Sequence, residues 1–311
     1  MSKVEKNLDL LIIGSGPAGL TAGLYAARLK LDTLILEDEL VGGQIKDAYI
    51  VENYPGFNSI SGSDLIDKIQ EQVISAGAKL DEYDNVISVK LTDEEKIIET
   101  KKYIYKPKAV IIASGSKRKE LPIEEERKFH SRGIHYCELC DGSLYENKHI
   151  AVVGGGSSAL LAASLLANYG YKITIIHRRD SFRADKKIQD EIFNNKKIEI
   201  IWNTKVISAI GEDKLKGLTI QNVNTKENSN LEVDGVFVYI GLLPRTEIFK
   251  DFIKVDNLGN IISNENCETN VKGVFAAGDV RVKAVRQLTT AVSDGTIAAL
   301  MAEKYISNLG R

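Results

Sequence analysis

The stretch LLIIGSGPAG, residues 10–19, decides the fold of this chain. It begins with an apolar, β-prone run, and its glycines follow the pattern G-x-G-x-x-G. Residues 20–30 then have helical periodicity, and a second apolar strand is expected at 31–37. A glycine-rich turn that opens a helix within a βαβ unit is typical of dinucleotide binding. The sequence therefore predicts a dinucleotide site at this turn.

The residues of this first glycine turn have separate physical roles. Gly14 permits the tight turn, Gly16 lets a pyrophosphate approach the backbone, and Gly19 lets the helix pack on the strand. The pyrophosphate then meets the positive end of the helix. Glu37 falls at the end of the second strand, where a carboxylate accepts hydrogen bonds from ribose hydroxyl groups.

The same arrangement recurs in the second half of the chain. An apolar strand at 149–153 leads into GGGSSA, residues 154–159, which has alanine at the last position of the pattern. A helix at 160–169 and a strand at 171–176 are expected to follow. In place of the acid of the first copy, this strand is followed by a basic cluster: His177, Arg178, Arg179 and Arg183.

This exchange of charge predicts that the two sites bind different nucleotides. A carboxylate suits a free 2′-hydroxyl group and repels a 2′-phosphate. Guanidinium groups bind a phosphate through charge-assisted, forked hydrogen bonds. The first site therefore fits FAD, and the second fits NADPH.

Between the two glycine turns lies YCELCDG, residues 136–142, which holds two of the chain's three cysteines. A close C-x-x-C pair indicates redox or metal chemistry, whereas three cysteines do not make a secreted disulfide framework. Only His130 and His135 lie nearby as further ligands, and zinc usually takes four, so no metal is expected. Asp141 follows the second cysteine and can shuttle a proton. Cys267 is expected to be an ordinary packing or surface residue.

Composition limits the remaining classes of function. The chain has 311 residues, 43% of them hydrophobic and 27% charged, which suits a globular protein of about two domains. With 41 basic and 43 acidic residues the net charge is -2, so nothing favours nucleic-acid binding. The first apolar run leads straight into the glycine turn and is too short for a signal peptide or a membrane span. We expect a cytoplasmic protein.

Further candidate residues lie in turns and loops. Gln44 and Asn53 are polar groups that can hydrogen-bond a ring or a sugar, or can simply be solvated loop amides. A buried strand at 109–113 ends in Ser114-Gly115-Ser116, and another strand, at 273–277, ends in Gly278-Asp279. From the residues alone, these turns are only suggestive of a ligand.

Taken together, the motifs resemble those of low-molecular-weight thioredoxin reductases of bacteria and archaea. The resemblance runs nearly from end to end and rests on GSGPAG at 14, GGQ at 42, VENYPGF at 51, ASG at 113, C-x-x-C-D at 137, GGGSSA at 154, HRRDSFRA at 177, GVFAAGDV at 273 and RQ at 286. It implies an α/β fold with two Rossmann-like domains of the three-layer ββα type. A FAD domain at 1–117 and 246–311 would carry an inserted NADPH domain at 118–245.

The resemblance also implies roles for individual residues. Cys140 would be the sulfur nearer the flavin, Cys137 would attack the thioredoxin disulfide, and Asp141 would be their acid-base partner. The implied FAD site consists of Gly14, Gly16, Pro17, Ala18, Gly19, Glu37, Gly43, Gln44, Asn53, Ala113, Gly115, Gly278, Asp279, Arg286 and Gln287. The implied NADPH site consists of Gly154, Gly156, Ser157, Ser158, Ala159, His177, Arg178, Arg179 and Arg183.

On this resemblance the protein is expected to be a homodimer that passes electrons from NADPH through FAD and the dithiol to thioredoxin. Its NADPH domain would rotate about hinges near 115–118 and 244–247. The chain departs from the family at Ser157 and at 160–163, Leu-Leu-Ala-Ala, where acidic side chains are usual. Relatives that take electrons from ferredoxin have lost their nucleotide motifs, so a ferredoxin-fed enzyme is one alternative. A flavin-binding redox sensor without turnover is another.

Overall fold

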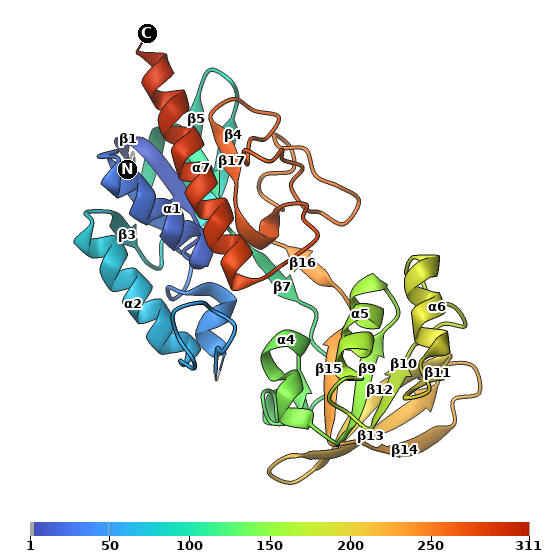
Figure 1. The fold of residues 1–311 in the computed structure, drawn as a ribbon. Coiled ribbons are helices and arrows are strands. Elements are labelled where there is room, and N and C mark those ends of the chain that lie inside the picture. The colour runs from blue at the N-terminus through green and yellow to red at the C-terminus, as the bar shows by residue number, and fades with distance from the viewer. Residues whose placement is uncertain (1–2, 49, 311) are drawn as a thin grey trace. The chain divides into compact units, whose positions relative to one another are not determined.

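The computed structural model describes residues 3–48 and 50–310 (Figure 1). The chain divides into two compact units. Unit 1 combines Met1–Lys117 with Leu243–Arg311, and unit 2 is Arg118–Leu242. Unit 2 is therefore inserted between the two segments of unit 1.

Unit 1 is built on one mixed sheet. Its strands are β1 (Val4–Ile13), β2 (Thr33–Leu36), β3 (Lys79–Asp81), β4 (Val86–Leu91), β5 (Lys96–Thr100), β6 (Tyr103–Ile112) and β17 (Val274–Ala276). The order is β3-β2-β1-β6-β5-β4, and β17 also pairs with β6. β1, β2, β3, β6 and β17 are parallel, whereas β4 and β5 form an antiparallel extension of β6.

Helices cover one face of this sheet. They are α1 (Pro17–Arg28), α2 (Gly62–Ser75) and α7 (Leu288–Leu309), and Figure 1 shows α7 beside α1 although they lie at opposite ends of the sequence. Leu10 and Ile12 of β1 pack toward the helices, while Leu11 and Ile13 pack on the other face, against the β4–β5 hairpin and residues such as Phe249. Because both faces are covered there, the end of β1, residues 10–13, is a continuous apolar run in sequence.

Unit 2 has a parallel sheet with the strand order β11-β10-β9-β15-β8. Its strands are β8 (Ile134–His135), β9 (His149–Gly154), β10 (Lys172–Ile176), β11 (Ile198–Ile201) and β15 (Gly235–Tyr239). The helices α5 (Ser157–Leu166) and α6 (Lys186–Asn194) pack on one face. An antiparallel sheet of β12 (Thr204–Gly211), β13 (Leu215–Asn222) and β14 (Asn228–Glu232) packs on the other.

Short helical segments occur in both units. They are η1 (Gly43–Asp47) and η3 (Gly278–Val280) in unit 1, and α3 (Glu126–Phe129), α4 (Glu138–Asp141) and η2 (Gly142–Tyr145) in unit 2. α4 and η2 together carry the residues around the C-x-x-C pair.

The chain crosses between the units through β7 (Ser116–Arg118) and β16 (Leu242–Pro244), which pair with each other. On the side of unit 1, the Arg245 amide donates to the Gly115 carbonyl over 3.0 Å. On the side of unit 2, the Lys119 amide donates to the Gly241 carbonyl over 3.0 Å. Both glycines have positive φ, 66° for Gly115 and 127° for Gly241, a conformation that L side chains rarely adopt.

The structure confirms the predicted α/β class, and unit 2 lies in sequence between the two segments of unit 1. Predicted bounds differ by a few residues. The helix expected at 160–169 is α5, Ser157–Leu166, because Gly156 caps it. α6 and β12 were not predicted, since the apolar residues of α6 are sparse and those of β12 come in adjacent pairs around Ser208 instead of alternating. In the described part of the chain, no helix has both the length and the apolar character to cross a membrane.

Candidate active site

The first glycine turn connects the end of β1 to α1 and is tightly packed at two of its glycines. Gly14 has a φ of 105°, and a Cβ atom there would lie 2.4 Å from the Ala113 carbonyl oxygen. A Cβ atom on Gly19 would lie 1.8 Å from the Gly14 carbonyl oxygen. Gly16, in contrast, has no atom within 4 Å of its would-be Cβ. The turn therefore has one open approach to its backbone, at Gly16.

This open approach is bordered by backbone groups. Gly16 is the N-cap of α1, with Pro17 at the first helical position and no acidic residue in the first turn. A Cβ atom on Gly43, at the start of η1, would lie 3.1 Å from the Gly16 Cα atom. The Gly42 amide also donates to the Ser15 carbonyl over 3.2 Å. The GGQ loop and the glycine turn thus form one concave strip of backbone at a helix N-terminus.

Glu37 lies directly after β2 and is buried, with 7% of its surface exposed. Its Oε2 accepts hydrogen bonds from the Ser15 amide at 2.8 Å and the Ser15 hydroxyl at 2.5 Å. Its Oε1 accepts from the Asp38 amide at 3.0 Å. Burial raises the pKa of this carboxyl group, and the hydrogen bonds from Ser15 oppose that shift. The predicted ribose-binding acid is therefore held against the glycine turn.

Several predicted flavin residues from distant parts of unit 1 make contact. The Asn53 amide donates to Gln287 Oε1 at 3.4 Å, and Gln287 also caps α7. The Gln44 amide donates to the Ser116 carbonyl at 2.5 Å. Arg286 donates to Asn260 Oδ1 at 3.1 Å through Nη2. Its buried Nε has no hydrogen-bond partner among the described residues.

Asp294 in α7 is a residue that the sequence did not single out. It is buried, and its Oδ2 accepts from the Gly278 amide at 3.0 Å and from Lys283 at 2.8 Å. Its Oδ1 accepts from Arg281 at 3.0 Å. Gly278 has a φ of 80°, so Asp294 fixes the strained turn that carries Asp279. No sequence motif indicated this contact, because an acid inside a helix usually faces solvent.

The second glycine turn has the same construction in unit 2. Gly154 has a φ of 155°, and a Cβ atom there would lie 2.5 Å from the Tyr239 carbonyl oxygen and 2.8 Å from the Ala159 Cβ. Gly156 again has no atom within 4 Å of its would-be Cβ, and it is the N-cap of α5. Ser157 begins that helix and Ser158 is exposed. The backbone at Gly156 is thus open to a ligand.

The basic cluster lies beside this second turn. The Arg183 amide donates to the Gly155 carbonyl over 2.9 Å. Arg178, Arg179 and Arg183 are exposed, and within residues 3–48 and 50–310 none of their guanidinium groups forms an ion pair. Their charge is therefore available to an anionic group.

His177 is placed differently from the three arginines. Its ring is buried against Gly155, where a Cβ atom would lie 2.2 Å from it, and its Nε2 lies 3.1 Å from the Ser181 carbonyl. It also packs on the rings of Phe182 and Trp202. Burial lowers the pKa of His177, so the imidazole shapes the loop as a neutral group.

The C-x-x-C pair is closed as a Cys137–Cys140 disulfide, with Cα atoms 5.3 Å apart. Cys137 is the N-cap of α4 and is nearly buried, whereas Cys140 is partly exposed. The pair therefore lies at the start of a helix. α4 is a single turn, however, and Glu138 and Asp141 lie within it, so its dipole contributes little to stabilising a thiolate.

Polar side chains surround the disulfide. The Glu138 amide donates to the Tyr239 hydroxyl at 3.0 Å, and that hydroxyl donates to the Glu138 carboxylate. Burial raises the pKa of Tyr239. Asp141 Oδ2 lies 3.2 Å from His135 Nδ1. From the sequence, His135 was only a possible metal ligand, and its spacing from Asp141 does not predict the contact between their side chains.

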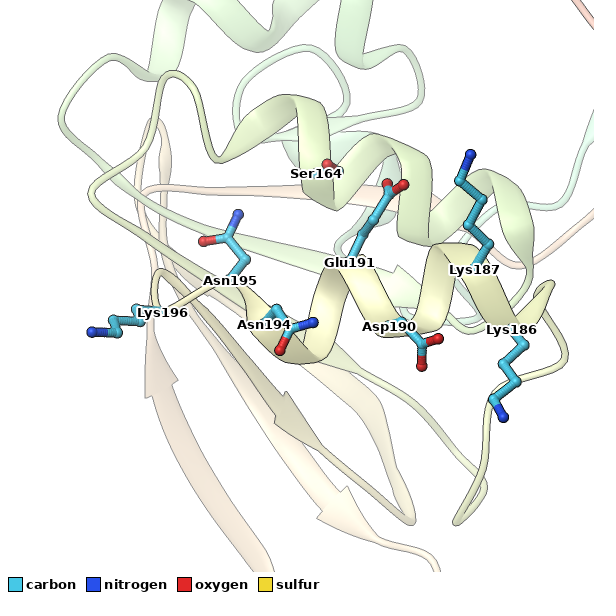
Figure 2. A pocket seen from close by; sticks show the side chains of 8 residues that line it. All are labelled: Ser164, Lys186, Lys187, Asp190, Glu191, Asn194, Asn195 and Lys196. Atoms are coloured by element: carbon cyan, nitrogen blue, oxygen red, sulfur yellow. The ribbon is translucent and has the colours of Figure 1, made fainter.

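The hollows at the surface lie apart from most of the predicted residues. One of about 880 Å³ lies along α5 and α6. Figure 2 shows Glu191 and Lys187 rising from α6 toward α5, which carries Ser164, while Lys186 and Asp190 point away. Its charges are mixed, and it contains none of the predicted site residues. A smaller hollow of about 560 Å³ lies in the loop that holds Asn53.

The described residues contain no cluster of potential metal ligands. Across residues 3–48 and 50–310, no three His, Cys, Asp or Glu side chains are placed to hold a metal ion. Cys267, in unit 1, is a buried free thiol.

Comparison with known proteins shows one family along nearly the whole chain. Residues 8–295 match the family described as pyridine nucleotide-disulphide oxidoreductase. A protein of Clostridium pasteurianum, named 34.2 kDa protein in rubredoxin operon, is 58% identical over 304 residues, covering 98% of this chain and 99% of its own. A thioredoxin reductase of Listeria innocua is 42% identical over 311 residues, with 99% and 97% covered. The solved thioredoxin reductase from Streptococcus pyogenes has 40% identity and a TM-score of 0.91, with 97% and 99% covered.

Proposed function

The chain belongs to the pyridine nucleotide-disulphide oxidoreductase family, and we propose that within this family it is an NADPH-dependent thioredoxin-disulfide reductase that uses FAD. The observation that carries this proposal is the Cys137–Cys140 disulfide in a chain with two open glycine turns. An acidic residue accompanies the first turn and a cluster of arginines accompanies the second. Thioredoxin reductases from several bacteria are similar to it over their full length.

FAD fits unit 1. The open backbone at Gly16, the positive end of α1 and the buried carboxylate of Glu37 suit a dinucleotide with a free ribose hydroxyl. The glycine turn of unit 1, or the strand that leads into it, is bordered by Gly43, Ala113 and Gly115. Gln44, Asn53, Asp279, Arg286 and Gln287 would hydrogen-bond the bound group. When bound, FAD supplies the two-electron relay between nicotinamide and sulfur.

NADPH fits unit 2. The open backbone at Gly156 and the N-terminus of α5 would receive its pyrophosphate, with Ser157, Ser158 and Ala159 beside it. Arg178, Arg179 and Arg183 would bind its 2′-phosphate, because guanidinium groups match phosphate geometry. We accordingly assign 1–117 and 246–311 as the FAD domain and 118–245 as the NADPH domain.

The cysteines carry the exchange with thioredoxin. Cys137 is proposed to attack the thioredoxin disulfide as a thiolate, because thiolate is the nucleophilic form. Cys140 then closes the disulfide on Cys137, and it is proposed to be the sulfur nearer the flavin. Asp141 takes and returns the proton that the sulfur must lose and regain. We also propose that 115–118 and 244–247 are hinges, that the enzyme is a homodimer and that it works in the cytoplasm, where dithiols stay reduced.

One departure from the family motif leaves ferredoxin as an alternative electron donor. The start of α5 carries Leu160, Leu161 and Ala162 in place of acidic residues; Leu160 and Ala162 are buried, and Leu161 is exposed. The intact arginine cluster favours NADPH instead. An experiment can distinguish NADPH from ferredoxin directly, because only the true donor reduces the enzyme rapidly.

The decisive experiment is an anaerobic titration of the purified protein, followed by its visible absorbance. We expect NADPH to bleach the flavin band, NADH to do so poorly, and added oxidised thioredoxin to restore it. Bleaching by reduced ferredoxin alone would assign that protein as donor. A protein that is colourless and cannot be loaded with flavin would refute the proposed function altogether.

The matched variants are Cys137→Ser and Cys267→Ser. The first removes the proposed nucleophile and should abolish thioredoxin reduction, while the flavin is still bleached by NADPH. The second removes the buried free thiol and should leave turnover unchanged. Unchanged thioredoxin reduction by Cys137→Ser would show that the dithiol does not carry the exchange, and a lack of turnover in the unmodified protein would support the redox sensor instead.

A further inference from the structure

His135, the last residue of β8, lies beside the dithiol helix but has no part in the function proposed above. Its side chain is 3% exposed. Nδ1 lies 3.2 Å from Asp141 Oδ2, and Nε2 lies 2.7 Å from the Tyr145 hydroxyl oxygen. Both ring nitrogens of this buried histidine therefore face a polar partner, and one partner is the proposed acid-base residue.

The surrounding packing holds the imidazole in place. β8 pairs with β15 so that His135 lies opposite Phe237, and their rings stack with centroids 5.2 Å apart. The Tyr145 ring meets both of them edge-on. Gly235 leaves the space for Tyr145, because a Cβ atom there would lie 2.3 Å from its ring. The three rings form a rigid support under Asp141.

The arrangement allows the imidazole to gain or lose a proton without losing a partner. Burial raises the pKa of Tyr145, and the charges of Asp141 and Asp234 raise it further, so its hydroxyl stays protonated. In the neutral ring, Nε2–H can donate to the Tyr145 hydroxyl oxygen, and Nδ1 can accept from a protonated Asp141 carboxyl group. When the ring takes that proton it keeps both partners, because Nδ1–H then donates to the Asp141 carboxylate.

We propose that His135 is a positioning residue for the acid-base chemistry of the dithiol, which holds Asp141 in place and shares a proton with it. The proposal rests on the thioredoxin reductase function given above. It differs from that function in assigning the proton transfer to a buried His135–Asp141 pair backed by Tyr145, instead of to Asp141 alone. α4 has little dipole to offer, so the pair supplies the control of sulfur protonation that the helix does not.

The exchange then balances as follows. The Cys137 thiolate attacks a sulfur of the substrate disulfide, forms a mixed disulfide and releases one substrate thiolate. Cys140 loses its thiol proton to the Asp141–His135 pair and attacks Cys137 Sγ, which closes the Cys137–Cys140 bond and releases the second substrate thiolate. The pair returns its proton to a departing thiolate. Two electrons pass to the substrate, which takes its other proton from solvent.

The titratable groups around His135 come from separate elements. Asp141 lies in α4 and Tyr145 in η2, and Asp234 precedes β15. Glu138 is engaged by Tyr239. A pH profile of the dithiol reports on all of them, so the test needs a variant that removes only the titration of the imidazole.

His135→Asn is that variant, because an asparagine amide places a donor near the position of Nδ1 but does not titrate. His149→Asn is the matched control: this histidine is also buried in a strand of the same sheet, but its Nε2 lies 2.8 Å from the Thr174 hydroxyl. Tyr145→Phe keeps the ring packing and removes only the hydroxyl group. It tests the pair from the opposite side if His135→Asn does not fold.

Two readouts on the reduced full-length protein apply to each variant. The first is the rate of alkylation of Cys137 and Cys140 by iodoacetamide against pH, which needs no thioredoxin. The second is the single-turnover rate of reoxidation by oxidised thioredoxin. We expect His135→Asn to slow reoxidation by roughly tenfold and to shift the inflection of the alkylation profile. Tyr145→Phe should shift the same inflection, and His149→Asn should match the unmodified protein.

The proposal is overturned if His135→Asn and His149→Asn have the same alkylation profile and the same reoxidation rate, or, where His135→Asn does not fold, if Tyr145→Phe leaves the inflection in place. Failure of the unmodified protein to reduce thioredoxin would refute the proposed function instead. The alkylation profile still decides the role of His135 in that case, because it depends only on the dithiol and its neighbours.

Discussion

Gly16 and Gly19 lie in the same turn but have opposite surroundings. We expect Gly19→Ala to destabilise unit 1 by about 1–3 kcal/mol, because its Cβ would lie 1.8 Å from the Gly14 carbonyl oxygen. Gly16→Ala meets no atom within 4 Å, so its cost as an N-cap change should stay below about 1 kcal/mol. The added methyl group would nevertheless obstruct the pyrophosphate.

Urea unfolding and the amount of flavin bound per chain check this pair. Gly16→Ala should fold with nearly full stability and bind flavin poorly, whereas Gly19→Ala should lose both. Full flavin binding by Gly16→Ala would show that the open approach is not where the dinucleotide lies.

Cys267 gives a second prediction at the scale of the residue. Burial raises the pKa of its thiol from 9.0 to about 11. The folded pKa is therefore above the unfolded one, so the stability that this thiol contributes is present below about pH 9 and lost as pH rises through about 11. The loss is at most ~1.4 kcal/mol per pH unit. Urea unfolding from about pH 8 to about pH 10 measures it.

Cys267→Ser is the control for that alkaline decline. Serine has no thiol to titrate, so the variant should lose less stability over the same pH range. The native thiol should also resist iodoacetamide until the protein is unfolded, since it is fully buried. Equal alkaline declines in both proteins would contradict the prediction.

Residues whose role depends on local backbone could be predicted from the sequence, and residues whose role depends on a distant partner could not. Gly14 and Gly154 were identified because a turn with positive φ requires glycine. The contact of His135 with Asp141 arises only because β8 and α4 are packed beside β15. Asp294 was missed for the same reason: its partners Gly278, Arg281 and Lys283 precede α7 and return to it through the fold.

At the scale of the element, α7 and α1 pack closely at Gly295. A Cβ atom there would lie 2.2 Å from the Ala18 carbonyl oxygen in α1. Gly295→Ala gains about 1 kcal/mol of helix propensity, but we expect a clash of about 1–3 kcal/mol to outweigh it. Ser293→Ala lies in the same helix and is exposed. It should stabilise slightly, by about 0.5 kcal/mol.

Thermal unfolding of the two variants, measured side by side, tests this packing. The expected shifts in melting temperature have opposite signs, so a general effect of alanine in α7 cannot imitate them. An increase in stability for Gly295→Ala would mean that α1 and α7 can move apart at little cost.

Long apolar strands were the elements most reliably predicted, because burial on both faces makes them continuous in sequence. β1 and β9 are examples. α6 and β12 were missed because they are only partly buried: α6 exposes its lysines and Asn194, and β12 exposes Lys205 and Ile210. Strand order could not be predicted either. The pairing of β17 with β6 joins segments from the two ends of the chain, and no local pattern specifies it.

At the scale of the whole molecule, unit 1 is made from two segments whose ends meet. Gly115 and Arg245 are hydrogen-bonded at 3.0 Å, next to the points where the chain leaves and re-enters the unit. We expect a chain in which a short Gly-Gly linker joins Lys117 to Leu243 to fold and to bind flavin. Its visible spectrum and its flavin content measure the outcome. A protein that aggregates without flavin would show that unit 1 depends on unit 2.

The paired crossing at β7 and β16 also has an evolutionary consequence. A single contiguous stretch of gene encodes everything between the two strands, including the arginine cluster and the disulfide. If unit 2 binds the electron donor as proposed, recombination at these junctions can exchange the donor preference and the sulfur chemistry together. The flavin half would be inherited unaltered, so lineages with different reductants can diverge by swapping a middle segment instead of accumulating point changes throughout.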